Sequence, residues 1–428
     1  MLKKRNITYK KGIEIILYAL VFLYCIFHDA IYSPDTPSYI NANIYRSPGY
    51  PIFTRSIQIV FQGYFNFFIV LIQALLGLFA VYTISSKVRK ILELNYVLHL
   101  IFLVLLLFPF FSPLQVANNI SSEGLSYPLY LFFLSFSLDF IILNTKKSLI
   151  YIIICSIFLA LTRGQFLILP FVLAILYIFK YKRTVFNRFH LTRFMLLLII
   201  PFISILADKS YHKIKDGLFI STPFTYINAA ASALYISKAE DVNSLENEDY
   251  KHIFNDCYSF ISKNKWLLSS EERMSNAEDY KHFHRNLGKI CNLTLHERGT
   301  AYFLNKNNTI VEARYYTEQA AKAMFPILVK NNFKEWICLF YSNLIYGFKL
   351  PILFIFVLFA MLFSAFKAIK VSNKNVYIIL FLSALILSNA LVVAFASHSI
   401  MRYLFYNYSL FFLILVSIFK YINHVREN

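Results

Sequence analysis

The feature that most constrains this chain is a series of apolar segments, each long enough to cross a lipid bilayer. About ten segments meet the usual requirement of roughly 20 mostly apolar residues. They cover residues 13–31, 66–86, 95–112, 123–143, 148–162, 165–179, 194–208, 344–366, 375–396 and 403–420. Only 15% of the residues are charged, whereas soluble domains carry roughly 25%. The sequence therefore predicts an all-α polytopic membrane protein with about ten transmembrane helices.

Lysine and arginine residues are distributed unevenly among the short loops between these segments. With the N-terminus in the cytoplasm, the inner loops hold about 20 of them and the outer loops about four, as the positive-inside rule requires. The outer four are Arg46, Arg55, Arg163 and Arg402. This bias explains the net charge of +19 without a nucleic-acid partner. We expect a multi-pass protein of a bacterial plasma (inner) membrane with both termini in the cytoplasm.

The predicted spans divide the chain into three parts. Residues 1–208 form an N-terminal transmembrane module of seven spans, whose first outside loop covers residues 32–65, and residues 344–428 form a C-terminal module of three spans. Residues 209–343 are too long for a simple linker, and their stretches 226–235 and 313–329 are typical of helices. We expect this segment to be a mostly helical, extracytoplasmic loop domain. In that location its Cys257 and Cys291 are able to pair, although nothing in the sequence requires it.

The first outside loop carries an unusual set of residues. Asp35 lies between two prolines that restrict its backbone, and Tyr39, Arg46 and a Pro-Gly-Tyr-Pro turn at residues 48–51 follow. Two interpretations of Asp35 remain open at this point. Its carboxylate either caps a short helix that starts at the next residue, or acts as a base that faces the outside of the membrane.

Three more charged residues stand at the outer ends of predicted spans. Glu123 begins the fourth span, Arg163 separates the fifth from the sixth, and Arg402 enters the last span, followed by Tyr403. Glu123 alone would complement a helix dipole, and a lone Arg163 would snorkel to the interface. Taken together with Asp35, these residues suit transfer from a lipid phosphate, because arginine binds phosphate through charge-assisted bonds.

These residues resemble those of the GT-C superfamily of polyprenyl-phosphate-dependent membrane glycosyltransferases. The resemblance is to the bacterial branch related to protein mannosyltransferases and lipid A aminoarabinose transferases. It lies in SPDTPSY at residues 33–39, RSPGYPIF at 46–53, Ser-Glu at 122–123, Leu-Thr-Arg at 161–163 and Arg-Tyr at 402–403. The resemblance implies a GT-C-like fold with a long outside loop after the seventh span.

The resemblance also implies a reaction. A sugar would move from a polyprenyl-phosphate donor to a glycan or lipid acceptor on the extracytoplasmic face, by a single inverting displacement. Asp35 would be the catalytic base, Arg163 and Arg402 would bind the donor phosphate, and the supporting residues would be Tyr39, Arg46, Glu123 and Tyr403. Many family members carry two close acidic residues in the first loop. Here the nearest second acid is Asp29, so the motif does not support a divalent metal, and no cofactor is predicted.

Two other functions fit the same topology. An O-antigen or capsule repeat-unit polymerase would share the spans and the large outside loop, but its working arginines would lie inside that loop. The candidates for that role are Arg273, Arg285, Arg298 and Arg314. A lipid-linked glycan flippase would place polar residues near the membrane midplane, and the predicted spans contain few of them.

Overall fold

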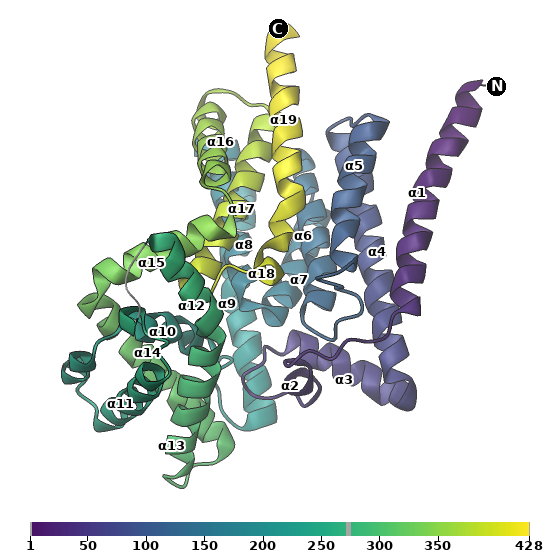
Figure 1. The fold of residues 1–428 in the computed structure, drawn as a ribbon. Coiled ribbons are helices and arrows are strands. Elements are labelled where there is room, and N and C mark those ends of the chain that lie inside the picture. The colour runs from purple at the N-terminus through teal and green to yellow at the C-terminus, as the bar shows by residue number, and fades with distance from the viewer. Residues whose placement is uncertain (1, 271–274, 428) are drawn as a thin grey trace.

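The computed structural model describes residues 2–270 and 275–427, and this part of the chain is all-helical (Figure 1). Seven helical segments within it are long and apolar enough to cross a membrane. They are Gly49–Ile91, Glu123–Leu143, Gly164–Phe186, Arg188–Asp216, Pro351–Lys370, Lys374–Ala396 and Met401–Glu427. The all-helical architecture is as predicted, and the length and composition of these segments are compatible with a helical membrane protein.

Each of the ten predicted spans falls on a helix. These helices are α1 (Leu2–Phe27), α4 (Phe65–Ile91), α5 (Tyr96–Leu107), α6 (Glu123–Leu143), α7 (Lys146–Thr162), α8 (Leu169–Tyr181), α9 (Arg188–Asp216), α16 (Pro351–Lys370), α17 (Lys374–Ala396) and α19 (Tyr408–Glu427). Helices α1, α5 and α7 lie outside the seven long apolar segments, and α5 and α7 have only 12 and 17 residues. The span count of ten therefore stays a prediction.

One predicted boundary is wrong. The span expected at 344–366 begins instead at Pro351, because α15 (Phe333–Gly347) ends first and the chain turns between the two helices. Lys349 in this turn has a φ of 65°. Proline suits the first turn of a helix, where its missing N–H is not needed, so α16 starts there.

The segment predicted as a loop domain is helical, as expected. It contains α10 (Thr225–Ile236), α11 (Glu248–Lys263), α12 (Asn276–Ile290), α13 (Thr300–Leu304), α14 (Ile310–Asn331) and α15, and α10 and α14 cover the two stretches expected to be helical. Their apolar faces form a core separate from that of the transmembrane bundle. Cys257 and Cys291 are buried in this core as free thiols.

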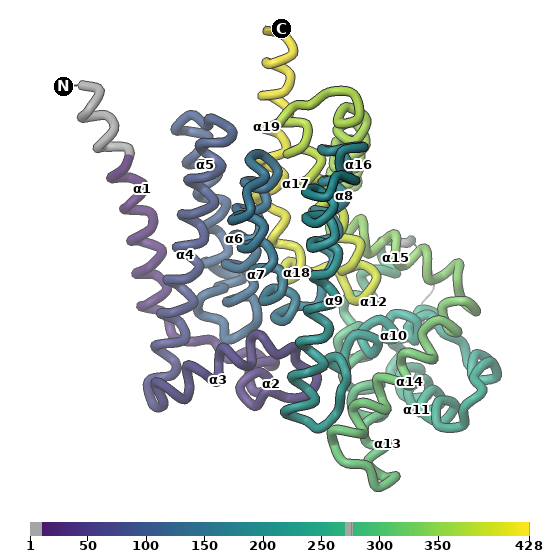
Figure 2. The backbone as a smooth tube through the Cα atoms, turned by 180° about the vertical axis from the view of Figure 1, so that it is seen from behind, coloured from purple at the N-terminus to yellow at the C-terminus, as the bar shows by residue number. Residues whose placement is uncertain are grey.

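The two ends of the described chain lie on one side of the bundle, and the loop domain lies toward the other side (Figure 1). Helices α2 (Thr36–Ile40) and α3 (Gly49–Phe61) lie on that second side as well. Seen from behind, α9 continues out of the bundle beside these elements and the loop domain (Figure 2). This arrangement agrees with a shared side for both termini, while the cytoplasmic assignment of that side stays a prediction.

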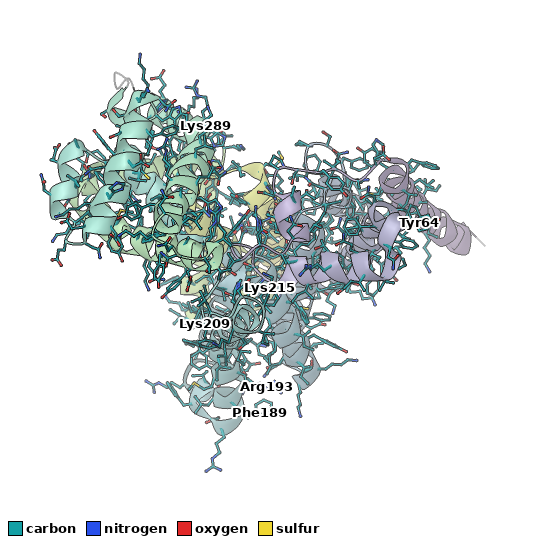
Figure 3. The ribbon with its side chains drawn as sticks, turned by 90° about the horizontal axis from the view of Figure 1, so that it is seen from below. Tyr64, Phe189, Arg193, Lys209, Lys215 and Lys289 are labelled. Carbon is teal, nitrogen blue, oxygen red and sulfur yellow. The ribbon has the colours of Figure 1, made fainter. Side chains whose placement is uncertain are left out.

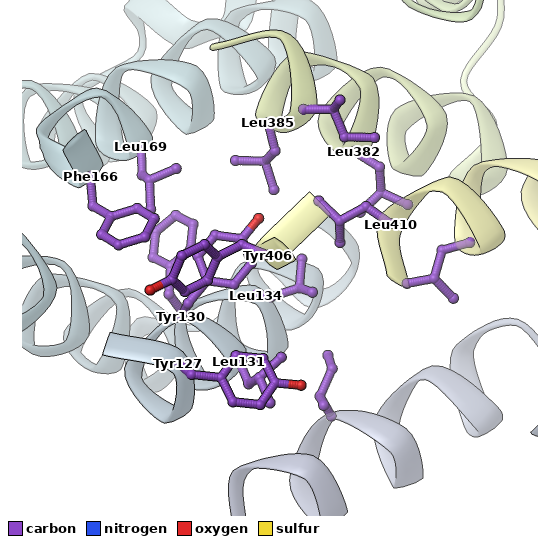
Figure 4. Packing of buried hydrophobic residues seen from close by; sticks show 14 of the residues in the cluster. Tyr127, Tyr130, Leu131, Leu134, Phe166, Leu169, Leu382, Leu385, Tyr406 and Leu410 are labelled. Atoms are coloured by element: carbon purple, nitrogen blue, oxygen red, sulfur yellow. The ribbon is translucent and has the colours of Figure 1, made fainter. Parts of the chain in front are cut away.

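A buried aromatic cluster joins the three elements that follow the charged residues at the span ends (Figure 4). The ring of Tyr406 lies 5.0 Å from Phe166 and 5.2 Å from Tyr130, and its hydroxyl lies 2.6 Å from Ser126 Oγ. Ser126 and Tyr130 belong to the first turns of α6, and Phe166 and Tyr406 belong to the short 3-10 turns after residues 163 and 402. The cluster therefore fixes these three chain segments relative to one another.

Candidate functional site

The first outside loop is held against the loop that precedes α6 by backbone hydrogen bonds. Ile31 N–H donates to Asn118 O over 2.8 Å, and Ile120 N–H donates to Ile31 O over 3.0 Å. The Thr36 hydroxyl adds a bond of 2.9 Å to the carbonyl of Ile120. These bonds bring the start of α2 next to the start of α6, and Asp35 therefore lies beside Glu123.

Asp35 stands at the N-cap position of α2, but its side chain does not cap the helix. One carboxylate oxygen accepts from Arg46 Nη2 over 2.7 Å, and the other accepts from Arg402 Nη1 over 2.6 Å. The capping interpretation of this carboxylate is therefore wrong. Burial raises the pKa of Asp35, but the two guanidinium groups outweigh burial and hold this pKa below its usual value of 3.8.

Arg46 is itself fixed by two neighbours from the same loop. Its Nε donates to Ser38 Oγ over 2.7 Å, and its guanidinium carbon lies 4.6 Å from the centre of the Tyr39 ring. The Tyr39 hydroxyl donates to Ser122 Oγ over 3.3 Å. Arg46 is thus in place to hold the Asp35 carboxylate, and Tyr39 packs against Arg46.

Glu123 links the two arginines that the sequence assigns to the donor phosphate. It accepts from Arg163 Nη1 over 2.5 Å and from Arg402 Nη2 over 3.1 Å, and Arg402 Nε bonds it as well. Its side chain is only 4% exposed, so removal of either partner would leave a charge in a poorly solvated place. Glu123 is also the first residue of α6, where an acidic side chain complements the helix dipole.

The charged residues that pair with one another in this region carry an excess of positive charge. Three guanidinium groups, from Arg46, Arg163 and Arg402, face two carboxylates, from Asp35 and Glu123. The formal sum is one positive charge, and the ring of Tyr403 lies 5.0 Å from the guanidinium carbon of Arg163. An anion that entered here would complete the charge balance.

A cavity of about 220 Å³ opens on these residues. Six of the seven predicted site residues line it, namely Asp35, Tyr39, Arg46, Arg163, Arg402 and Tyr403. Glu123 does not line it and instead orients two of the arginines from behind. Asp29, the acidic residue just before the first loop, is exposed and does not line the cavity.

Another wall of the cavity contains residues that the sequence did not single out. Tyr45, Thr222, Phe224, Thr225 and Asn228 line it. Only Tyr45 gives a sequence signal, because it precedes Arg46 in the loop. The other four residues lie between α9 and α10 or in the first turn of α10. Their position next to the first loop depends on how the loop domain packs.

Tyr45 connects this wall to the loop domain. The guanidinium carbons of Arg46 and Arg314 both lie 5.3 Å from its ring centre. The rings of Phe224 and His296 lie 5.8 and 4.6 Å away. Burial, with help from Arg314 and Arg46, lowers the pKa of His296 to about 3, so this imidazole adds no charge to the site near neutral pH.

The arginines proposed for a polymerase are placed differently. Arg298 pairs with Asp256 over 2.8 Å, and Arg285 is exposed and donates to the carbonyl of Lys281. Arg314 reaches Tyr45 at the cavity wall. Arg273 lies outside the described residues.

No family model, curated protein or solved structure matches this chain. Within the described ranges, no group of three or more His, Cys, Asp and Glu side chains is placed to hold a metal ion. The charges and hydrogen bonds of the cavity are therefore the features from which a function can be inferred.

Proposed function

We propose that this protein is a GT-C-type membrane glycosyltransferase with about ten spans. It would transfer a sugar from a polyprenyl-phosphate carrier to a glycan or lipid acceptor on the extracytoplasmic face. One observation carries this proposal. Asp35 lies in a cavity that is also lined by Arg163 and Arg402, two arginines that are both oriented by Glu123.

The donor phosphate fits the positive end of the cavity. Arg163 and Arg402 line it and carry the charge that the two carboxylates leave uncompensated. Guanidinium groups bind phosphate oxygens through charge-assisted and often bidentate bonds. Because Glu123 holds both guanidinium groups in place beforehand, they stabilise the charge that develops on the leaving phosphate without further reorganisation.

The reaction is a single displacement. An acceptor hydroxyl oxygen forms a bond to the anomeric carbon, and the bond from that carbon to the phosphate oxygen breaks with its electron pair going to the phosphate. Asp35 accepts the hydroxyl proton and later releases it to solvent. Its lowered pKa keeps it ionised. A phosphate that binds Arg402 competes with Asp35 for that guanidinium, and this competition strengthens the base when the donor is present.

The two alternatives explain less of the site. A polymerase based on the loop-domain arginines leaves Arg163 and Arg402 without a role, and of its candidates in the described ranges only Arg314 reaches the cavity wall. A flippase needs ionisable groups near the midplane. The internal pairs found instead link Glu14 to Arg89 over 3.1 Å and Lys87 to Asp139, at the bundle end predicted to be cytoplasmic.

The test is Asp35→Asn, assayed for sugar transfer in membranes with a panel of polyprenyl-phosphate sugars. The substitution keeps size and hydrogen bonding but removes the base, so we expect a loss of about 10²- to 10⁴-fold. Asp29→Asn, six positions earlier and outside the cavity, is the matched control and should keep full activity.

Two results would refute the proposal. One is an Asp35→Asn variant that transfers sugar as fast as the wild type. The other is a wild type that uses only diphosphate-linked repeat units as donors, because that donor belongs to a polymerase.

A further inference from the structure

A second cavity, of about 410 Å³, adjoins the arginine cavity on the side of the loop domain. Thr222 and Thr225 line both cavities. The rest of its lining comes from the end of α9, from the connection to α10 and from α14. Its polar side chains include the hydroxyls of Tyr226 and Tyr315 and the amide of Gln319.

Two lysines give this second cavity a positive charge. Lys209 Nζ lies 5.7 Å from the ring centre of Phe219, and Lys322 Nζ lies 5.5 Å from that of Tyr226. Among the described residues, the salt bridges at this end of α9 involve His212 and Lys215 and include neither Lys209 nor Lys322. Figure 3, seen from below, shows Lys209 near the junction of the loop domain and the bundle.

The one carboxylate in the lining is already engaged. Glu318 accepts the backbone N–H groups of Tyr226 over 2.8 Å and of Ile227 over 3.1 Å, at the start of α10. Its side chain therefore stabilises the helix terminus. Lys322 interacts electrostatically with Glu318, and Lys209 with Asp208, but neither lysine forms a salt bridge among the described residues.

The wall that the two cavities share is fixed in position. Asp208 accepts both the backbone N–H and the hydroxyl of Thr222, each over 2.8 Å. His212 Nε2 lies 3.2 Å from the same hydroxyl. A ligand in the second cavity would therefore lie at a constant distance from the arginine cavity.

We propose that the second cavity binds the acceptor and that the acceptor is an anionic glycan, which carries a phosphate or carboxylate group. This inference rests on the proposed function. The donor phosphate occupies the arginine cavity, so the acceptor must approach Asp35 from a neighbouring space. The second cavity supplies hydroxyl and amide groups for a sugar, aromatic faces, and two lysines without a salt bridge among the described residues for a negative group.

The test uses wild-type protein in detergent and measures the rate at which individual lysines are acetylated. Glucose 1-phosphate is the anionic probe, and glucose is the neutral one. We expect glucose 1-phosphate to slow acetylation of Lys209 and Lys322 about fivefold or more, and glucose to have no effect. Lys213 and Lys330, which lie on the same two helices outside the second cavity, serve as internal controls. Equal rates at all four lysines with and without glucose 1-phosphate would refute the site.

A second experiment distinguishes between a glycan and a lipid headgroup as the ligand of the second cavity. The same acetylation is measured in nanodiscs of phosphatidylcholine and of phosphatidylglycerol, without any sugar phosphate. Unchanged rates in both support the acceptor assignment. Protection by phosphatidylglycerol alone would overturn it, because a lipid phosphate would then occupy the cavity.

The acetylation measurement does not depend on whether the protein transfers a sugar. A separate experiment tests the role of the two lysines in transfer. In the transfer assay, the double variant Lys209→Ala/Lys322→Ala should raise KM for an anionic acceptor at least tenfold with little change in kcat, whereas Lys213→Ala/Lys330→Ala should not. If Asp35→Asn proves fully active, the proposed reaction fails while lysine protection still reports on the anion site. If protection fails and Asp35→Asn is inactive, only the acceptor assignment is lost.

Discussion

Arg402 Nη1 donates a hydrogen bond to Asp35 Oδ2 over 2.6 Å, although 367 positions separate the two residues in the chain. The same guanidinium also bonds Glu123 at the start of α6. One side chain from the C-terminal module thus joins two segments of the N-terminal module. The candidate site therefore exists only when both modules have assembled.

The first prediction concerns the pH dependence of transfer in Arg46→Gln. Burial raises the pKa of Asp35, and Arg46 and Arg402 together outweigh burial. A base works in its ionised form, so the acid limb of kcat/KM follows this pKa. Loss of one cation should raise the pKa of Asp35 and so move the acid limb to higher pH. The measurement is kcat/KM between pH 3.5 and 8.

Arg55→Gln is the control for this prediction, because Arg55 lies exposed on α3 in the same outside region. Its acid limb should coincide with that of the wild type. An unchanged acid limb in Arg46→Gln would show that Asp35 does not limit the rate at low pH.

The sequence predicted the helices well because long apolar runs are local features. Each predicted span needs only a stretch of the chain that is long and apolar enough. The error at 344–366 arose because apolar residues continue through the turn at Lys349, where only the backbone conformation separates α15 from α16. The packing of the loop domain had no comparable local signal.

The sequence also singled out the charged part of the candidate site, because charged residues at the ends of long apolar segments are rare enough to stand out. It did not identify the cavity wall formed by Tyr45, Phe224 and Asn228. Tyrosine, phenylalanine and asparagine are ordinary residues at any interface. Their role depends on contacts between the first loop and α10, which no local pattern encodes.

The second prediction is that Glu123→Gln destabilises the protein strongly. The neutral amide leaves Arg163 and Arg402 without their shared counter-ion in a place that is poorly solvated. Breaking a buried pair in this way typically costs about 3–5 kcal/mol. Chemical denaturation in detergent measures the change.

Glu248→Gln is its counterpart, since that side chain is 83% exposed and its pair with Lys251 joins adjacent helical turns. This variant should change the free energy of unfolding by less than about 0.5 kcal/mol. Equal stability of Glu123→Gln and the wild type would mean that the two arginines do not need the carboxylate.

The third prediction concerns Gly49, where the start of α3 approaches the end of α7. A Cβ at this position would lie 2.7 Å from Thr162 Oγ1 and 2.9 Å from the carbonyl of Leu161. Gly49→Ala should therefore displace the end of α7 and, with it, Arg163. We expect a loss of about 1–3 kcal/mol in the free energy of unfolding, together with a higher donor KM.

Gly288→Ala separates this packing effect from the general effect of alanine in a helix. Gly288 lies within α12, and a Cβ there would have no atom within 4 Å. Alanine at such a site should stabilise the helix by up to about 1 kcal/mol. If both variants gain stability, the close approach of α3 to α7 does not require glycine at position 49.

The fourth prediction concerns Glu318, which lies beneath the second cavity. Burial is the main reason that its pKa rises to about 7, and the backbone bonds from α10 offset burial only in part. The folded protein therefore keeps this proton up to pH about 7, whereas the unfolded chain releases it near the ordinary value of 4.5. Between these pH values the folded state holds more protons, so the free energy of unfolding should fall as pH rises.

Glu318→Gln removes the titrating group and should flatten this part of the stability curve, by about 3 kcal/mol at most. Thermal and chemical denaturation at intervals from pH 4.5 to 8 measure the difference between the two proteins. Glu312→Gln is the matched control on the same helix, because Glu312 is well solvated and its hydrogen bonds from Thr309 lower its pKa. A carboxyl group whose pKa is lowered in the folded state makes the free energy of unfolding rise with pH. Glu312→Gln should therefore leave in place the fall in the free energy of unfolding that Glu318 causes. A wild type whose stability does not fall more steeply than that of Glu318→Gln would mean that Glu318 is ionised in the folded protein throughout this range.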